Sequence, residues 1–250
     1  MTPRIGGRSR ADRLHAQYSA LGSGVREQVV TSFSRAGADA YGRRCVQSWD
    51  AAAPLVIYLD EPMHLPVETR LTSEIPLWLQ TRSQLPNQNE AASRPEYYRW
   101  QARRFAVKPF VWLDAAEKLG SGVLTWLDGD TVTRRRIPDG FFVGLLEGAD
   151  VAYLGRGPMH PETGYVGFRI PAALPLLRWC RDAYLTGAFR GLDGWTDCHV
   201  LRAALRAVPV RATDLTSDRY VGNSHIWPVS PLAPYLTHFK GRKKGVLIAC

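Results

Sequence analysis

A run of apolar residues that ends in two carboxylates sets the strongest limit on the fold of this chain. Residues 123–127 read Val-Leu-Thr-Trp-Leu, and Asp128, Gly129 and Asp130 follow directly. The run predicts a buried strand, so the acid pair lies where that strand ends. Ligands of open α/β sheets bind at the carboxyl edge of the strands, where one or two carboxylates can hold Mg²⁺ or Mn²⁺ on a phosphorylated ligand. The pair therefore indicates a divalent-metal site.

Two other interpretations of the acid pair were considered. A plain turn also explains an Asp-x-Asp motif, because Gly129 fits a turn as well as a metal-binding loop. A calcium loop of the EF-hand type is excluded, since its glycine position holds Thr133 and its bidentate glutamate position holds Asp139. The motif alone leaves the metal site and the turn open.

A second segment contains residue types that could complete such a site. His238, Gly241 and Lys244 form a His-x-x-Gly-x-x-Lys pattern. Imidazole binds Mn²⁺-like ions, glycine lets the backbone approach a phosphate, and lysine brings a positive charge to a diphosphate. A basic terminal stretch can instead be a solvated tail. The aromatic residues and prolines at 226–236 favour an ordered segment, because disordered chains are poor in aromatic residues.

These motifs resemble the metal-dependent nucleotide-sugar glycosyltransferases of the GT-A fold, over about residues 27–245. In that family a strand-terminal Asp-x-Asp binds the metal on the donor diphosphate. Several retaining members end in His-x-x-Gly-x-x-Lys, whose histidine completes the metal shell and whose lysine holds the phosphates. The resemblance implies Mn²⁺ or Mg²⁺ as cofactor, bound by Asp128, Asp130 and His238. Many retaining members have Pro-Trp after the lysine, but this chain has Gly-Val, so the stereochemical outcome stays open.

The resemblance also assigns residues to the donor. The family contacts the nucleoside from the first strand and uses basic residues of a helix that here reads Arg-Arg-Phe-x-x-Lys. The residues assigned to donor binding are Thr31, Ser32, Phe33, Arg104, Lys108, Asp128, Trp195, Gly241 and Lys244. Arg104 and Lys108 lie four residues apart on one predicted helix face, and that face could instead be solvated.

Two carboxylates are candidates for catalysis. Asp197 matches a family position where an acidic residue faces the donor sugar and the acceptor, and it would act as a base if the reaction inverts. Thr196 or Asp197 could instead cap the helix that follows. Glu162 opens a predicted loop that runs into a strand, and a carboxylate entering the sheet edge there could position a sugar hydroxyl. The glycines after Glu162 could also exist only to make turns.

Alternating strand and helix patterns predict the fold class. We expect an α/β, GT-A-like single domain at 27–250, with a mixed, mostly parallel central sheet flanked by helices, after a basic flexible segment at 1–26. Strands are predicted at 27–33, 54–59, 123–127, 150–154 and 165–169. Helices are predicted at 38–50, 96–106, 109–119, 139–146, 172–186 and 196–207. The proline-rich stretch 60–95 is predicted to be mostly loop.

The net charge of the chain bears on which molecule accepts the sugar. A net charge of +9, from 32 Lys and Arg against 23 Asp and Glu, suits a polyanion such as nucleic acid or an anionic membrane surface. A soluble Arg-rich protein would carry the same charge. Segments 126–132, 153–156 and 238–241 resemble glycosyltransferase-like proteins of bacteriophages. We therefore expect hexosyl or pentosyl transfer from a UDP-sugar to an acceptor hydroxyl, with a hydroxymethylated pyrimidine of phage DNA as the favoured acceptor.

Aromatic residues could supply stacking surfaces for an extruded base or an open strand. The candidates are Trp78, Tyr97, Tyr98 and Trp100.

Other functions stay open. The acceptor could be a surface saccharide or a lipid-linked glycan. A nucleotidyltransferase is an alternative because Gly120 and Ser121 precede the acid pair, although the gap is short and Gly129 replaces the usual apolar residue. A non-catalytic nucleic-acid-binding protein would explain the charge but not the strand-end carboxylates, and no nucleic-acid-binding signature accompanies the charge.

The sequence also bears on location. Residues 1–26 lack the apolar core of a signal peptide, and eighteen apolar residues never run together. We expect a cytoplasmic protein of a bacterium or a phage-infected host, with no transmembrane segment. The four cysteines have no paired or metal-like spacing, so no disulfides are expected.

Overall fold

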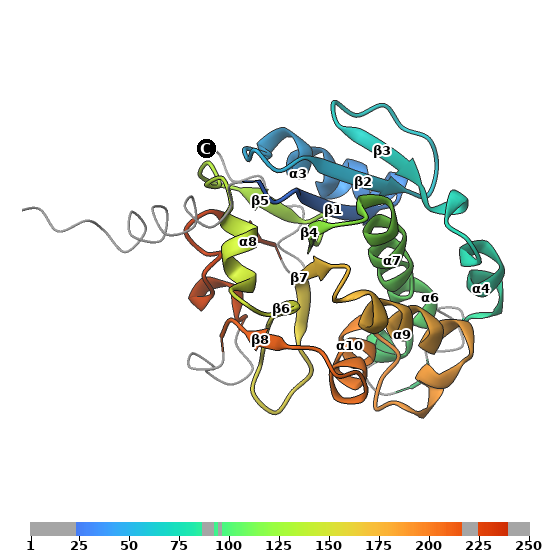
Figure 1. The fold of residues 1–250 in the computed structure, drawn as a ribbon. Coiled ribbons are helices and arrows are strands. Elements are labelled where there is room, and N and C mark those ends of the chain that lie inside the picture. The colour runs from blue at the N-terminus through green and yellow to red at the C-terminus, as the bar shows by residue number, and fades with distance from the viewer. Residues whose placement is uncertain (1–23, 87–92, 95–96, 217–224, 240–250) are drawn as a thin grey trace, which may run out of the picture.

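A central sheet organises the part of the chain that the computed structural model describes, which is residues 24–86, 93–94, 97–216 and 225–239 (Figure 1). Within these residues the sheet has seven strands in the order β3-β2-β1-β4-β7-β6-β8. The strands are β1 (Glu27–Phe33), β2 (Leu55–Leu59), β3 (Glu68–Leu71), β4 (Gly122–Leu127), β6 (Val151–Leu154), β7 (Glu162–Ile170) and β8 (Ala212–Asp214).

Strand directions make the sheet mixed and mostly parallel. β3, β2, β1 and β4 run parallel to one another, and β8 is parallel to β6. Among the described strands of this seven-stranded sheet, β7 alone is antiparallel to its neighbours, which are β4 and β6. The predicted fold class, an α/β domain with a mixed, mostly parallel sheet flanked by helices, is confirmed. Because β7 is reversed, its amino end lies at the same edge as the carboxyl end of β4.

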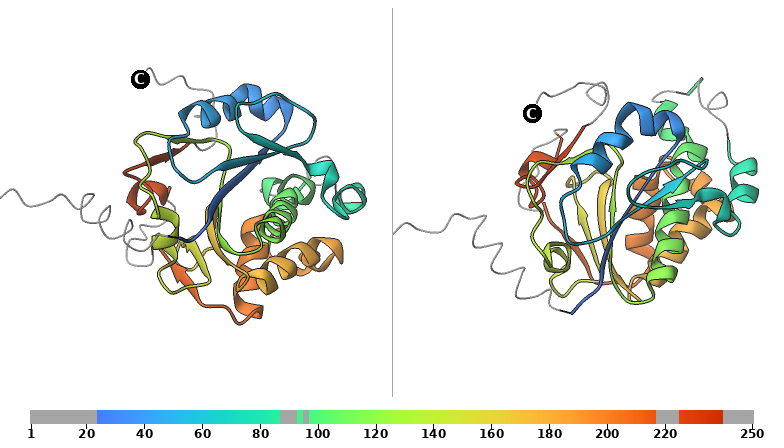
Figure 2. Two further views of the ribbon diagram at one scale, coloured as in Figure 1. Left: turned by 45° about the horizontal axis from the view of Figure 1, so that its top comes forward. Right: turned by 90° about the horizontal axis from the view of Figure 1, so that it is seen from above.

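Helices cover both faces of the sheet (Figure 2). On one face Trp112 of α7 packs against Trp126 and Phe168, with ring centroids 6.1 and 5.5 Å apart. On the other face Phe33 and Leu127 belong to an apolar cluster that also takes in residues of α3 and α8. Successive strand residues point to opposite faces, so strands buried on both sides are apolar throughout. This explains the continuous apolar run of β4.

The helices lie close to their predicted positions. The α-helices are α2 (Arg35–Gly37), α3 (Arg43–Ser48), α4 (Trp78–Gln84), α6 (Ala102–Phe105), α7 (Val107–Leu119), α8 (Phe141–Leu146), α9 (Leu174–Leu185) and α10 (Asp197–Ala207). A π-helical turn η1 (Ala38–Gly42) joins α2 to α3, and short 3₁₀ turns are η2 (Thr72–Glu74), η3 (Tyr97–Trp100), η4 (Ala188–Gly191) and η5 (Trp227–Val229).

A small second sheet connects the end of the described chain to the loop after β4. It pairs β5 (Thr131–Thr133) with β9 (Leu236–His238) in antiparallel register, and Thr131 lies opposite His238. The backbone N–H of Phe239 donates to the carbonyl of Asp130 at 3.0 Å, which extends this pairing toward the acid pair. Segments far apart in the sequence therefore meet at the carboxyl edge of β4.

Several sequence predictions were wrong in detail. The stretch 60–95 contains β3 and α4, and the helix predicted at 96–106 is divided into η3 and α6 at Gln101. Glu162 lies in β7 and not in a loop, and Gly164 and Gly167 are strand residues and not turn residues. The helix predicted at 38–50 begins at Arg35 and ends at Ser48.

Some predictions concern residues outside this description. Residues 1–23 are not described, so the division into a segment at 1–26 and a domain at 27–250 stays a prediction. Gly241 and Lys244 also lie outside the described residues. No helix in the described ranges is both long and apolar enough to cross a membrane. Cys45, Cys180 and Cys198 are free thiols.

Candidate active site

The acid pair is held at the end of β4 by contacts that require glycine between the two carboxylates. The backbone N–H of Asp128 donates to the carbonyl of Gly164 at 2.9 Å, which continues the pairing of β4 with β7. A β-carbon at Gly129 would lie 2.8 Å from the ring of Phe33 and 3.3 Å from the ring of Tyr41. Only glycine therefore lets this loop pack against the end of β1.

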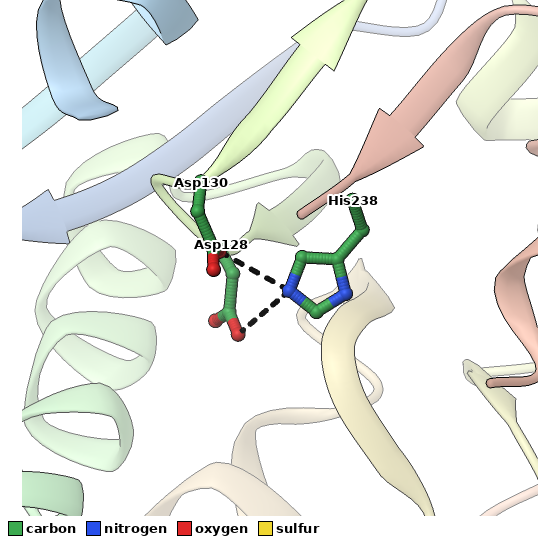
Figure 3. A group of neighbouring side chains, drawn as sticks. All are labelled: Asp128, Asp130 and His238. Carbon is green, nitrogen blue, oxygen red and sulfur yellow. Dashed lines mark ion pairs between the residues drawn. The ribbon is translucent and has the colours of Figure 1, made fainter. Parts of the chain in front are cut away.

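Strand pairing brings an imidazole to the same place (Figure 3). Nε2 of His238 lies 3.1 Å from Oδ1 of Asp130 and 3.6 Å from Oδ2 of Asp128. The other ring nitrogen, Nδ1, lies 3.3 Å from Nε2 of His225. The ring of Trp227 packs on His238 with centroids 4.8 Å apart. These neighbours fix the imidazole with Nε2 toward the carboxylates.

Gly164 is a further requirement for this arrangement. A β-carbon at this position would lie 3.0 Å from Cε1 of His238 and 3.2 Å from Nε1 of Trp227. A larger residue would therefore push His238 away from Asp130. The strand glycine leaves room for the imidazole, a role that the sequence did not indicate.

The three side chains fit a divalent cation. One ligand atom from each of Asp128, Asp130 and His238 lies within 4.8 Å of the other two. Carboxylate oxygens and an imidazole nitrogen suit Mn²⁺, and the oxygens suit Mg²⁺. The side chains of Asp130 and His238 are each only 2% exposed, while that of Asp128 is 23% exposed. A ligand would therefore approach from the side of Asp128.

The side chain of Lys108, from the first turn of α7, joins this group to a third carboxylate. Its Nζ lies 2.7 Å from Oδ1 of Asp128 and 2.7 Å from Oδ2 of Asp197. The hydroxyl of Thr163 also donates to Oδ2 of Asp197, at 2.6 Å. Asp197 is the first residue of α10 and is 1% exposed. Its carboxylate is thus bound across the sheet edge and does not act as a simple helix cap.

The electrostatic environment keeps both Asp128 and Lys108 ionised. Burial acts to raise the pKa of Asp128, but the charges of Lys108 and His238 outweigh it and lower that pKa to about 2. Burial acts to lower the pKa of Lys108, but Asp128 and Asp197 raise it well above its ordinary value. Asp128 is therefore an anion, and Lys108 a cation, throughout the neutral pH range.

Other predicted donor residues differ in how close they come to this group. Thr31 is fully buried in β1, and its hydroxyl has no hydrogen-bond partner among the described residues. A β-carbon at Gly129 would lie 3.4 Å from that hydroxyl. Ser32 is half-buried and Phe33 is buried beside the acid loop. Arg104 is exposed in α6, with its guanidinium over the ring of Phe105.

Trp195 and Glu162 are both buried, although Trp195 was predicted to contact the donor and Glu162 to lie in a loop. Trp195 is buried between Trp100 and Phe189, with ring centroids 5.3 and 5.5 Å away, so it is part of the hydrophobic core. Glu162 is buried at the start of β7, where Oε2 lies 3.7 Å from Nη1 of Arg156.

Several site residues were missed by the sequence interpretation. They are Tyr41, Thr163, Gly164, His225 and Trp227. His225 and Trp227 precede the His238 segment closely, and a histidine and tryptophan beside a candidate metal ligand were the available signal.

Comparison with known proteins gives a likeness in structure but none in sequence to a family model or a curated protein. No protein-family model matches the chain, and no curated protein matches it. Among solved structures, the chain is similar to the apo structure of the bifunctional glycosyltransferase WbbM, with 12% sequence identity and a TM-score of 0.48. The match covers 88% of this chain and 46% of that one, so the chain spans less than half of that protein.

The role of Gly164 can be tested by metal binding. Gly164→Val should displace His238 and lower the affinity for Mn²⁺ by about tenfold or more, as losses of groups that orient a metal ligand do. Affinity can be measured from free Mn²⁺ by electron paramagnetic resonance. Gly191→Val is the control, because a β-carbon there meets nothing within 4 Å. Equal losses in both variants would contradict the role.

Proposed function

We propose that this protein is a metal-dependent glycosyltransferase that moves a sugar from a nucleotide-diphosphate sugar, a UDP-sugar, to an acceptor hydroxyl. The observation that carries the proposal is the convergence of Asp128, Asp130 and His238 at the carboxyl edge of β4. The sequence pattern predicted this set from two distant motifs. A plain turn would not need a buried histidine facing both carboxylates.

The metal site would serve the leaving group. A Mn²⁺ or Mg²⁺ ion held by Asp128, Asp130 and His238 would neutralise the diphosphate as the glycosidic bond breaks. Gly241 and Lys244 are proposed to contact the same phosphates, on the sequence pattern alone. Thr31, Ser32 and Phe33 are proposed for the nucleoside side of the donor, since β1 ends beside the acid loop.

Two carboxylates are proposed to act on the transferred sugar. Asp197 is proposed as the catalytic carboxylate, because Lys108 and Thr163 hold its Oδ2 at 2.7 and 2.6 Å and so fix its orientation. Glu162 is proposed to orient a sugar hydroxyl. Its pairing with Arg156 favours such a positioning role over proton transfer. Arg104, exposed on α6, and Trp195, two residues before Asp197, complete the proposed donor contacts.

The proposed acceptor is DNA, with hydroxymethylated pyrimidines as the modified bases. The positive net charge supports it, and Tyr97 and Tyr98 are each 50% exposed beside Arg99. Trp78 does not contribute a stacking surface, because it is buried against Phe110 with ring centroids 5.2 Å apart. A surface saccharide or a lipid-linked glycan is the competing acceptor.

Metal dependence tests the core of the proposal. Asp130→Ala should abolish transfer and hydrolysis of UDP-sugars, because it removes a buried ligand while leaving the sheet intact. Activity across a panel of UDP-sugars can be measured with Mn²⁺ and with excess EDTA. Asp139→Ala removes an exposed carboxylate of the same region and should keep full activity. Full activity in EDTA, or in Asp130→Ala, would contradict the metal role.

The acceptor needs a separate experiment. The protein, Mn²⁺ and a mixture of nucleotide sugars are incubated with hydroxymethylated or unmodified DNA, and the nucleosides are analysed by mass spectrometry. We expect a hexose or pentose adduct on the hydroxymethylated base only. Binding to DNA should weaken linearly with the logarithm of salt concentration. Transfer to a glycan without any base adduct would rule out DNA, and nucleotide incorporation without sugar would favour a nucleotidyltransferase.

A further inference from the structure

A lysine ammonium shares a carboxylate with the candidate metal site. Lys108 contacts Oδ1 of Asp128, and Nε2 of His238 faces Oδ2 of the same carboxylate. The indole N–H of Trp126 donates to Oδ1 as well, at 3.0 Å. Oδ1 is therefore saturated by protein donors, and Oδ2 is the oxygen available to a cation. A metal ion and the ammonium would lie on the two oxygens of one carboxylate.

A metal ion at Oδ2 and the ammonium of Lys108 at Oδ1 would therefore be two cations close together in a partly buried site. The side chain of Lys108 is only 14% exposed, so solvent screens its charge poorly. The ammonium of Lys108 also contacts Asp197, and the carbonyl of Thr163 lies 3.4 Å from its Nζ. The positive charge of Lys108 therefore opposes any cation that binds at Oδ2.

We infer that Lys108 lowers the affinity of this site for a free divalent cation, so that the metal binds strongly only together with a diphosphate. The inference rests on the proposed function and adds how its site is regulated. A nucleoside diphosphate brings negative charge that offsets both the metal and the ammonium. Because coupling between two ligands is reciprocal, the metal should strengthen diphosphate binding by the same factor.

A purely structural role for Lys108 makes a different prediction. If the lysine only neutralises Asp197, its removal should destabilise the fold, since a buried carboxylate loses its partner. Metal affinity would then stay unchanged once that carboxylate is also neutralised. The two roles can therefore be separated in a background that lacks the Asp197 charge.

The decisive comparison is between Asp197→Asn and the double variant Asp197→Asn with Lys108→Met. Both variants lack the Asp197 carboxylate, and Asp128 keeps the indole N–H of Trp126 in both. The two variants therefore differ by the lysine ammonium and its contacts. Mn²⁺ binding is measured by electron paramagnetic resonance with and without UDP, and folding is checked by thermal melting. Without UDP, the double variant should bind Mn²⁺ about tenfold or more tightly than Asp197→Asn. The strengthening of Mn²⁺ binding by UDP should be smaller in the double variant.

Lys118→Met in the Asp197→Asn background is the matched control. Lys118 lies on the same helix and pairs with Asp114 at 2.7 Å, so its loss removes one charge and one ion pair away from the site. This control should leave Mn²⁺ affinity unchanged. Equal Mn²⁺ affinity with and without Lys108 would overturn the inference. If the wild-type protein binds no Mn²⁺ even with UDP, the proposed function fails instead.

Discussion

The pairing of β5 with β9 is the interaction on which the site depends. These strands contain three residues each, and an isolated pair of this length is not stable in water. Tertiary packing must therefore hold them, and the ring contact of Tyr235 with Phe141, at 4.9 Å, ties β9 to α8. The pairing places His238 beside Asp130, although the two residues are far apart in the sequence. Without it the acid pair would have no imidazole.

The balance of charges among the buried side chains is the second constraint on the site. Three carboxylates, from Asp128, Asp130 and Asp197, lie at an edge with little solvent exposure. The ammonium of Lys108 contacts Asp128 and Asp197, while Asp130 faces His238. Such a group persists only when each charge has partners, because a lone buried charge costs several kcal/mol. The group therefore retains negative charge for a cation, and we propose that the ammonium of Lys108 limits how strongly that cation is held.

The sequence predicted the parts that depend on local pattern. The apolar run of β4 with its terminal acids, and the alternation that defines the α/β sheet, are encoded by neighbouring residues. His238 was assigned to the same site by a motif. The strands β3, β5, β8 and β9 were missed because they are too short to show a period and, unlike the equally short but apolar β6, contain polar residues. The contacts of Lys108 with Asp197 depend on the folding of distant segments and leave no local signal.

Trp78 illustrates an error in the other direction, a function expected where the structure has a core residue. It was predicted to offer a stacking surface to a base, but it is buried in the hydrophobic core. An aromatic residue that stacks on a ligand and one that fills a core have the same appearance in a sequence. A turn was one open interpretation for Gly164, but this residue lies in a strand and leaves space for His238. Only the neighbours of a residue distinguish these roles.

The most direct test of the metal-centred account is diffraction from crystals grown with Mn²⁺ and UDP. Anomalous scattering locates manganese without reference to activity. The account predicts one strong peak within coordination distance of Asp128, Asp130 and His238, with the diphosphate on the open side of Asp128. A diphosphate bound without manganese at this position, or manganese bound elsewhere in the protein, would contradict it.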